Sequence, residues 1–72
     1  MDKLNLIKMA NNIGTFFKAE PDRDLAVAGI AQHLKNFWEP RMRRQIIDYV
    51  EQGGSELMDI VAEAVRQLPV SK

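Results

Sequence analysis

The chain turns a corner at Phe37-Trp38-Glu39-Pro40-Arg41-Met42-Arg43-Arg44, where two aromatic residues, a proline and three arginines lie close together. Proline lacks an amide donor and clashes with the preceding helical turn, so a helix that reaches residue 38 cannot continue through Pro40. Proline is nevertheless well suited to the first turn of a new helix. The sequence therefore predicts two helices that meet at this corner, over residues 22–38 and 40–52.

The segment before the corner contains two amphipathic patterns. Asp2 is a suitable N-cap for a first helix over residues 3–18, and Pro21 separates this helix from the second. The apolar stripe of the first helix contains Leu6, Met9, Ala10, Ile13, Phe16 and Phe17. The stripe of the second contains Val27, Ile30, Ala31, Leu34, Phe37 and Trp38. Three further apolar residues fall outside the stripes of their helices: Leu4, Ile7 and Ile47.

Glycine and serine residues mark the predicted helix boundaries after the corner. Gly53-Gly54 is a helix stop, and Ser55 is a suitable N-cap for a fourth helix over residues 55–68. Residues 69–72, which begin with a proline, are predicted to form a frayed tail. No segment shows the alternating pattern of a β-strand. The sequence therefore predicts an all-α fold, a small compact domain of about four short helices over residues 1–72.

The composition excludes several classes of protein. The 72 residues include ten basic and ten acidic side chains, and a net charge of zero disfavours a general nucleic-acid binder. There is no cysteine, so neither a disulfide nor a thiolate-bound metal can form, which is compatible with a reducing cytoplasm. No apolar run approaches the ~18 residues of a membrane span. We therefore expect a cytoplasmic protein that binds neither a membrane nor nucleic acid.

Side chains suited to catalysis are few. His33 is the only histidine, and its place at the edge of an apolar stripe favours a structural or interfacial role over zinc binding or catalysis. Ser55 lacks the lysine and the spacing of a phosphate-binding loop. The acidic residues Glu56, Asp59 and Glu63 share the helix face opposite the apolar stripe, which is typical of a solvated surface. The sequence predicts no catalytic, cofactor-binding or metal-binding residue.

Two features of the first helix are unusual for a helix interior. Asn11-Asn12 combines two residues of low helix propensity, and Gly14 removes a side chain at a cost of about 1 kcal/mol relative to alanine. A glycine here is useful if another backbone packs closely against it. The sequence leaves open whether that neighbour lies within the chain or in a partner protein.

The corner residues have two interpretations. In the first, Phe37 and Trp38 fill the core, and Glu39 pairs with Arg43 one helical turn later. In the second, the corner belongs to a protein interface, because aromatic residues and arginine are the usual anchors of interfaces. Arg43 lies among apolar residues of the third helix, where a guanidinium needs apolar surface along its stem and a carboxylate or backbone carbonyl at its end.

Three classes of function remain at this point. A subunit that acts through protein contacts accounts for the surplus apolar positions and the aromatic-arginine corner. A helix-turn-helix protein could place Arg41, Arg43 and Arg44 in a nucleic-acid groove, although the balanced charge disfavours it. An autonomous enzyme fits least well, because no nucleophile and base are recognisable in the sequence.

Several short motifs favour the first class, and their order is more specific than any one of them. They are Met9-Ala10-Asn11-Asn12-Ile13-Gly14 with Phe16-Phe17, Pro21-Asp22-Arg23, Ala28-Gly29-Ile30-Ala31 with His33-Leu34, and the block from Phe37 to Arg44. In this order, from Leu4 to about Leu68, the chain resembles the delta subunit of the cytosolic, NAD-dependent, molybdenum-containing formate dehydrogenases. The family more often has aspartate at the position of Glu39, so the carboxylate is retained.

The resemblance implies a non-catalytic accessory subunit of an oxidoreductase complex. In this family the large alpha subunit carries molybdopterin guanine dinucleotide and iron-sulfur clusters, and the beta and gamma subunits carry FMN, the NAD site and further clusters. The complex oxidises formate to CO₂ and reduces NAD⁺ to NADH. The delta subunit is expected to hold none of these cofactors and to support the assembly, cofactor loading or stability of the alpha subunit.

The resemblance also implies partners for this chain. They are the catalytic alpha subunit and its assembly factors, and the isolated chain could associate with itself. We expect the corner to form or support the surface that holds the alpha subunit. The predicted partner-binding residues are His33, Phe37, Trp38, Glu39, Pro40, Arg41, Arg43 and Arg44.

Overall fold

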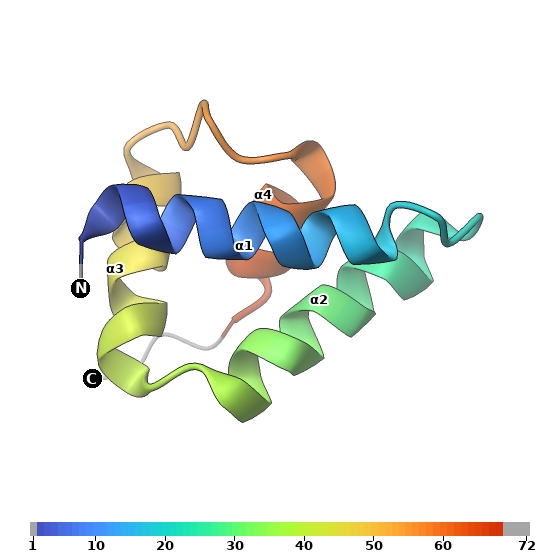
Figure 1. Ribbon diagram of the computed structural model, residues 1–72, viewed down its shortest axis with the longest axis horizontal. Coiled ribbons are helices and arrows are strands. Elements are labelled where there is room, and N and C mark those ends of the chain that lie inside the picture. Colours follow the sequence, from blue (N-terminus) through green and yellow to red (C-terminus); the bar gives the residue numbers. More distant parts are fainter. Residues whose placement is uncertain (1, 69–72) are drawn as a thin grey trace.

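Four helices make up the fold of residues 2–68, the part of the chain that the computed structural model describes (Figure 1). In chain order they are α1 (Lys3–Phe17), α2 (Arg23–Phe37), α3 (Pro40–Glu51) and α4 (Asp59–Arg66). The described part contains no strand, which confirms the predicted all-α fold class. The predicted frayed tail at residues 69–72 lies outside the described residues.

Three helices begin where the sequence supplies a cap or a proline. The side chain of Asp2 accepts a hydrogen bond from the amide of Leu4 at 3.3 Å, just before α1. The side chain of Asp22 accepts the amide of Asp24 at 3.0 Å, just before α2. Pro40 occupies the first position of α3, where a helix needs no amide donor. Local signals of this kind therefore place α1, α2 and α3 close to their predicted starts.

The fourth helix begins later than predicted. Ser55 does not cap a helix that starts at residue 55; it lies exposed in a loop, and α4 begins at Asp59 after the extended residue Met58. Gly53 and Gly54 have φ values of +130° and +59°, and they end α3 in backbone conformations that favour glycine. The chain then passes through turns rather than returning to a helix. Contacts with α1 and α3 explain why the loop remains open.

The loop before α4 is fastened by side chains from two helices. The amide nitrogen of Asn11 donates to the carbonyl of Glu56 at 2.9 Å, and its amide oxygen accepts the backbone N–H of Met58 at 3.0 Å. The Tyr49 hydroxyl accepts the backbone N–H of Glu56 at 3.0 Å. Asn11 therefore serves the fold itself, which explains an asparagine in the middle of a helix. It also provides the loop with hydrogen bonds that a longer α4 would have supplied.

The short helix α4 is the centre of the packing. It contacts α1, α2 and α3, and in Figure 1 it lies behind α1. The core consists of buried apolar residues from all four helices and the loop: Leu6, Ile7, Ala10, Val27, Ile30, Leu34, Trp38, Ile46, Val50, Leu57, Val61, Ala62, Ala64, Val65 and Leu68. The Cα radius of gyration is 11.0 Å, as expected for a compact chain of this length, about 11 Å.

Gly14 lies where α1 packs against α4. A Cβ atom added to Gly14 would lie 2.4 Å from Cγ2 of Val61 and 3.0 Å from the sulfur of Met58. The close neighbour of this glycine is therefore internal, and it consists of side chains rather than another backbone. Asn11 and Gly14 are explained by α4 and the loop before it, whereas Asn12 is exposed and has no structural explanation.

The core face of α1 is rotated relative to the predicted stripe. Ile7, predicted to lie outside, is 6% exposed and belongs to the core, whereas Phe16, predicted to face inward, is 78% exposed. On α2 the prediction for Trp38 is correct, since it is 5% exposed, but Phe37 is 73% exposed. The reason is that α4 packs on the side of α1 that carries Gly14, which turns Phe16 outward. Two large aromatic side chains are thus left on the surface.

Candidate functional site

The corner between α2 and α3 is held by an arginine. The Arg43 guanidinium donates hydrogen bonds to the carbonyl of Trp38 and, at 3.2 Å, to the carbonyl of Lys35. Carbonyls at the end of a helix lack amide partners, and basic side chains commonly satisfy them. Within residues 2–68 no ion pair joins Arg43 to Glu39, the pairing expected in the first of the two interpretations of the corner. Arg43 therefore finds a backbone carbonyl within its own chain and fixes the angle between α2 and α3.

The outer side of this corner forms a charged hollow. Among the described residues its walls are Glu39, Pro40, Arg41 and Arg44, which enclose about 520 Å³ of open space. All four residues are exposed. One carboxylate and two guanidinium groups at the start of α3 give this surface a mixed charge with a positive excess. We call it the charged hollow.

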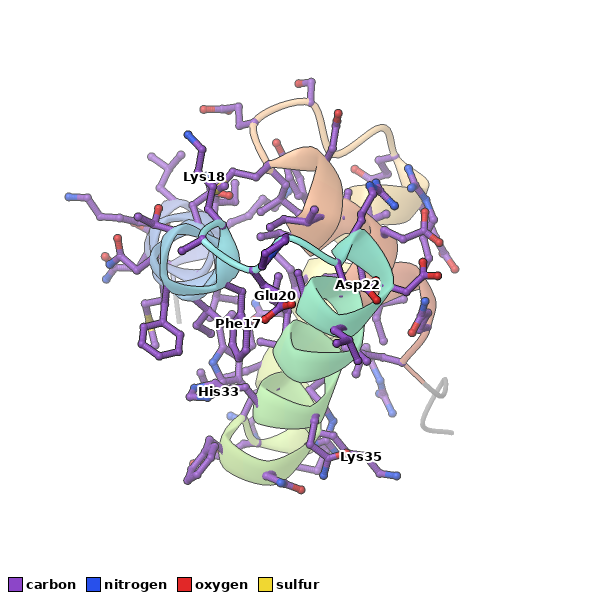
Figure 2. All side chains as sticks on the ribbon, turned by 90° about the vertical axis from the view of Figure 1, so that its right-hand side faces the viewer. Phe17, Lys18, Glu20, Asp22, His33 and Lys35 are labelled. Atoms are coloured by element: carbon purple, nitrogen blue, oxygen red, sulfur yellow. The ribbon has the colours of Figure 1, made fainter. Side chains whose placement is uncertain are left out.

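An apolar groove lies between α1 and α2. Its walls are formed by Asn12, Ile13, Phe16, Phe17, His33 and Phe37, and it has a volume of about 530 Å³. Figure 2 shows Phe17 of α1 and His33 of α2 on the same side of α2, with Lys35 on the other side. We call this feature the aromatic groove. Two of its lining residues, Phe16 on α1 and Phe37 on α2, are large apolar side chains that are mostly exposed.

Ring contacts organise both walls of the aromatic groove. The His33 and Phe37 rings, one helical turn apart, lie 4.7 Å apart between centroids at an interplanar angle of 38°. The rings of Phe16 and Phe17 meet edge to face at 5.1 Å. Phe17 also covers Gly29, where an added Cβ atom would lie 2.4 Å from the ring. The missing side chain at Gly29 thus makes room for Phe17 between the two helices.

The structure divides the eight predicted partner-binding residues into three groups. His33 and Phe37 line the aromatic groove, and Glu39, Pro40, Arg41 and Arg44 line the charged hollow. Trp38 is buried in the core, and Arg43 points at the carbonyls of α2. The last two residues support the corner rather than form its surface.

Sequence reasoning missed the half of the aromatic groove that comes from α1. Phe16 and Phe17 were both assigned to the core, although adjacent helical residues point about 100° apart. Asn12 and Ile13 precede them on the same helix and complete this wall. The aromatic pair was the available signal, because a narrow apolar stripe cannot bury both rings equally.

The acidic side chains of the fourth segment remain at the surface. Glu56 and Asp59 are exposed, and Glu63 lies 3.6 Å from Arg66 in a solvent-accessible pair. Across residues 2–68, no three side chains of histidine, aspartate or glutamate lie close enough together to hold a metal ion. None of the helices in this range has the length and apolar character needed to cross a membrane.

Comparison with known families gives one clear result. A family described as the NADH-dependent formate dehydrogenase delta subunit FdsD matches residues 5–65. This range includes all of α2 and α3, nearly all of α1 and α4, and the motifs on which the resemblance was based. Comparisons with curated proteins and with solved structures found no match. The match to most of the chain confirms the inferred resemblance: this protein belongs to the FdsD family of formate dehydrogenase delta subunits.

Proposed function

We propose that this chain is a non-catalytic accessory subunit of an NAD-dependent formate dehydrogenase and that it binds the catalytic alpha subunit. The observation that carries the proposal is the family match over residues 5–65. In this role the chain supports the assembly, cofactor loading or stability of the alpha subunit. The oxidation of formate and the reduction of NAD⁺ take place in the other subunits.

The polar side chains with hydrogen bonds to other elements stabilise the fold itself, which is consistent with a non-catalytic role. Asn11 and Tyr49 fasten the loop before α4, and Arg43 satisfies the end of α2. Meanwhile Phe16 and Phe37 are exposed although they are among the largest apolar side chains. Exposed aromatic rings are typical anchors of protein interfaces. Polar groups therefore stabilise the fold, and aromatic groups remain available for a partner.

The proposed binding surface extends around the corner of the molecule. His33 and Phe37 contribute through the aromatic groove, and Glu39, Pro40, Arg41 and Arg44 contribute through the charged hollow. Trp38 and Arg43 act indirectly, because they keep α2 and α3 at the angle that presents both surfaces.

The cofactors of the complex belong, in this proposal, to the other subunits. Molybdopterin guanine dinucleotide, the iron-sulfur clusters, FMN and NAD are all assigned to the alpha, beta and gamma subunits. The chain has no cysteine, and iron-sulfur clusters depend on cysteine thiolates. The proposed location of the complex is the cytoplasm, and assembly factors are further proposed partners.

The alternative function, nucleic-acid binding through α3, has weaker support. It requires Arg41, Arg43 and Arg44 to approach phosphate groups together. The guanidinium of Arg43 instead donates to carbonyls of α2. The net charge of zero also provides little attraction for a polyanion.

Co-purification tests the proposed function. The affinity-tagged chain is co-expressed with the alpha, beta and gamma subunits, and the alpha subunit retained on the resin is quantified. We expect the wild-type chain to retain it and Arg41→Glu to retain at least about tenfold less, as for an interface anchor. Arg23→Glu is the matched control, because Arg23 is exposed in the first turn of α2, where an acidic residue is tolerated. Failure of the wild-type chain to retain the alpha subunit would refute the proposal.

A further inference from the structure

We infer that Met58 is an oxidation site, at which a peroxide converts the thioether to the sulfoxide and thereby loosens the packing of the loop and α4 against α1. The inference goes beyond the proposed function, because it assigns a chemical modification to this chain, names the class of oxidant and gives the effect on the fold. It does not depend on the identity of the partner protein.

Methionine is the only sulfur-containing residue type in this chain. The sequence has four methionines and no cysteine, so oxidation of a thiol is excluded. Met9, Met42 and Met58 belong to residues 2–68, and all three are partly exposed. A small oxidant such as hydrogen peroxide can therefore reach them. The effect of oxidation then depends on what each side chain and its backbone hold in place.

The backbone of Met58 connects the loop to α4. Met58 is the extended residue directly before α4, with φ −61° and ψ 149°. Its N–H donates to the side-chain oxygen of Asn11 at 3.0 Å, and its carbonyl accepts the N–H of Ala62 at 2.9 Å. α4 lacks the side-chain cap that α1 and α2 have, so its start is held in place through Met58. By contrast, Met9 and Met42 lie inside α1 and α3.

The side chain of Met58 lies in the space that Gly14 leaves open on α1. A Cβ atom added to Gly14 would lie 3.0 Å from the sulfur and 3.6 Å from the terminal methyl group. The hydroxyl of Thr15 lies 3.9 Å from the same sulfur. Gly14 and Thr15 follow Asn11 by three and four residues, so all three share one face of α1. This face therefore holds both the backbone and the sulfur of Met58.

Oxidation adds one oxygen atom to this sulfur. The sulfur attacks one oxygen of hydrogen peroxide and the O–O bond breaks, which releases hydroxide. The hydroxide takes the proton of the new S–OH group, so the products are the sulfoxide and water. The sulfur has lost two electrons, and the peroxide has gained them. An apolar thioether has thus become a polar group that accepts hydrogen bonds.

The site of the thioether does not suit the sulfoxide. The packing at Gly14 is so close that an added Cβ atom would meet the sulfur at 3.0 Å and the fully buried Val61 at 2.4 Å. The Thr15 hydroxyl has one proton, and the carbonyl of Asn11 lies nearer to it, at 3.0 Å, than the sulfur does. The new oxygen therefore lacks space on the side of α1 and competes for its donor. Burial of a polar group under these conditions is unfavourable.

The oxidised side chain gains full access to water only when it moves away from α1. Because the backbone of Met58 continues directly into α4, this movement weakens the hydrogen bonds from Asn11 to the loop and the contact of α4 with Gly14. α4 contacts all three other helices, so loosening it lowers the stability of the whole domain. Oxidation of Met9 or Met42 leaves the Asn11 hydrogen bonds in place.

Peroxide treatment of the full-length chain tests the inference. The fraction of sulfoxide at each methionine is measured by peptide mapping with mass spectrometry, and Tm is measured by circular dichroism. As Met58 is oxidised, we expect Tm to fall by at least about 5 °C and hydrogen exchange at the Met58 amide to become faster. The two methionine sulfoxide reductases, one for each sulfoxide epimer, should restore both values.

Leucine variants assign the effect to one sulfur. Met58→Leu is similar in volume and has no sulfur at this position, so its Tm should fall by less than about 2 °C under the same treatment. Met9→Leu/Met42→Leu retains Met58, so its Tm should fall as much as that of the wild type. This double variant keeps the test decisive if Met58→Leu does not fold.

Four results would overturn the inference. They are an unchanged wild-type Tm when Met58 is oxidised, a Met58 that stays reduced while Met9 and Met42 are oxidised, a Met58→Leu variant that loses as much Tm as the wild type, and a Met9→Leu/Met42→Leu variant that keeps its Tm. None of them bears on the proposed function, which is tested by retention of the alpha subunit.

Discussion

Replacing Gly14 with alanine should destabilise the protein, although alanine is the better helix former. In an exposed helix this change stabilises by about 1 kcal/mol. Here the new Cβ atom would lie 2.4 Å from Cγ2 of Val61, where ordinary contacts are 3.4–4 Å, so α4 has to move by about 1 Å. Val61 is fully buried and cannot rotate into solvent. Overpacking costs ~1–3 kcal/mol, and an approach of 2.4 Å to a buried side chain belongs in the upper part of that range, ~2–3 kcal/mol. After the helix gain of about 1 kcal/mol is subtracted, we expect a net loss of about 1–2 kcal/mol.

Thermal and urea unfolding, followed by circular dichroism, would measure this loss. A decrease of about 1–2 kcal/mol corresponds to a Tm roughly 4–16 °C lower for a domain of this size. Gly29→Ala is the matched control, because its Cβ would meet the ring of Phe17, which is only partly buried and can swing toward the groove. That variant should stay within about 1 kcal/mol of wild type.

The double variant Gly14→Ala/Val61→Ala shows whether the clash is the cause. Removing the two methyl groups of Val61 opens the space that the new Cβ needs. The double variant should therefore be more stable than the sum of the single effects by at least about 1 kcal/mol. If Gly14→Ala alone proved as stable as wild type, α4 would not pack against Gly14 as described.

Three further substitutions test the remaining structural assignments. Arg43→Met should lower the free energy of unfolding by about 1–2 kcal/mol in urea titrations, because it removes charge-assisted hydrogen bonds at a part-buried site. The control Arg41→Met should change this free energy by less than about 0.5 kcal/mol, because Arg41 is exposed. Equal effects of the two variants would contradict the inward role of Arg43. Asn11→Ala should lower the free energy of unfolding by about 1–2 kcal/mol and speed hydrogen exchange at the Met58 amide. Unchanged exchange would contradict the hydrogen bonds by which Asn11 holds the loop before α4. Trp38→Ala should lower the free energy of unfolding by ~3–5 kcal/mol, so that the far-ultraviolet circular dichroism spectrum at 37 °C is that of a largely unfolded chain. A fully folded variant would show that this ring is not part of the core.

Local chemistry made much of the fold predictable. Asp2 and Asp22 are side-chain caps and Pro40 is a first-turn proline, and each acts on residues within one helical turn. The start of α4 was not predictable in this way. Ser55 is a good cap by local rules, but Asn11 holds the loop open from a position far away in the sequence, and Tyr49 assists from the preceding helix. Contacts across more than 40 residues leave no periodic signal.

The candidate site was predictable only in part, for a similar reason. The corner was identified from its aromatic and arginine content, and Phe37 and Arg41 are indeed exposed there. Its neighbour Trp38 is buried because the chain leaves the helix at that residue and turns the indole inward. Phe16 was predicted to be a core residue, but the packing of α4 against α1 rotates α1 so that Phe16 faces outward. The groove depends on the angle between two helices, which periodicity within each helix does not determine.

The rate of formate-dependent NADH formation, with and without this chain, is the most direct test of its accessory role. The rate is measured in extracts of cells that produce the alpha, beta and gamma subunits, after the levels of these subunits have been equalised. Without the chain we expect the rate to fall severalfold, and co-expression of the wild-type chain should restore it. A full rate in the absence of the chain would contradict the proposal that it supports the catalytic subunit.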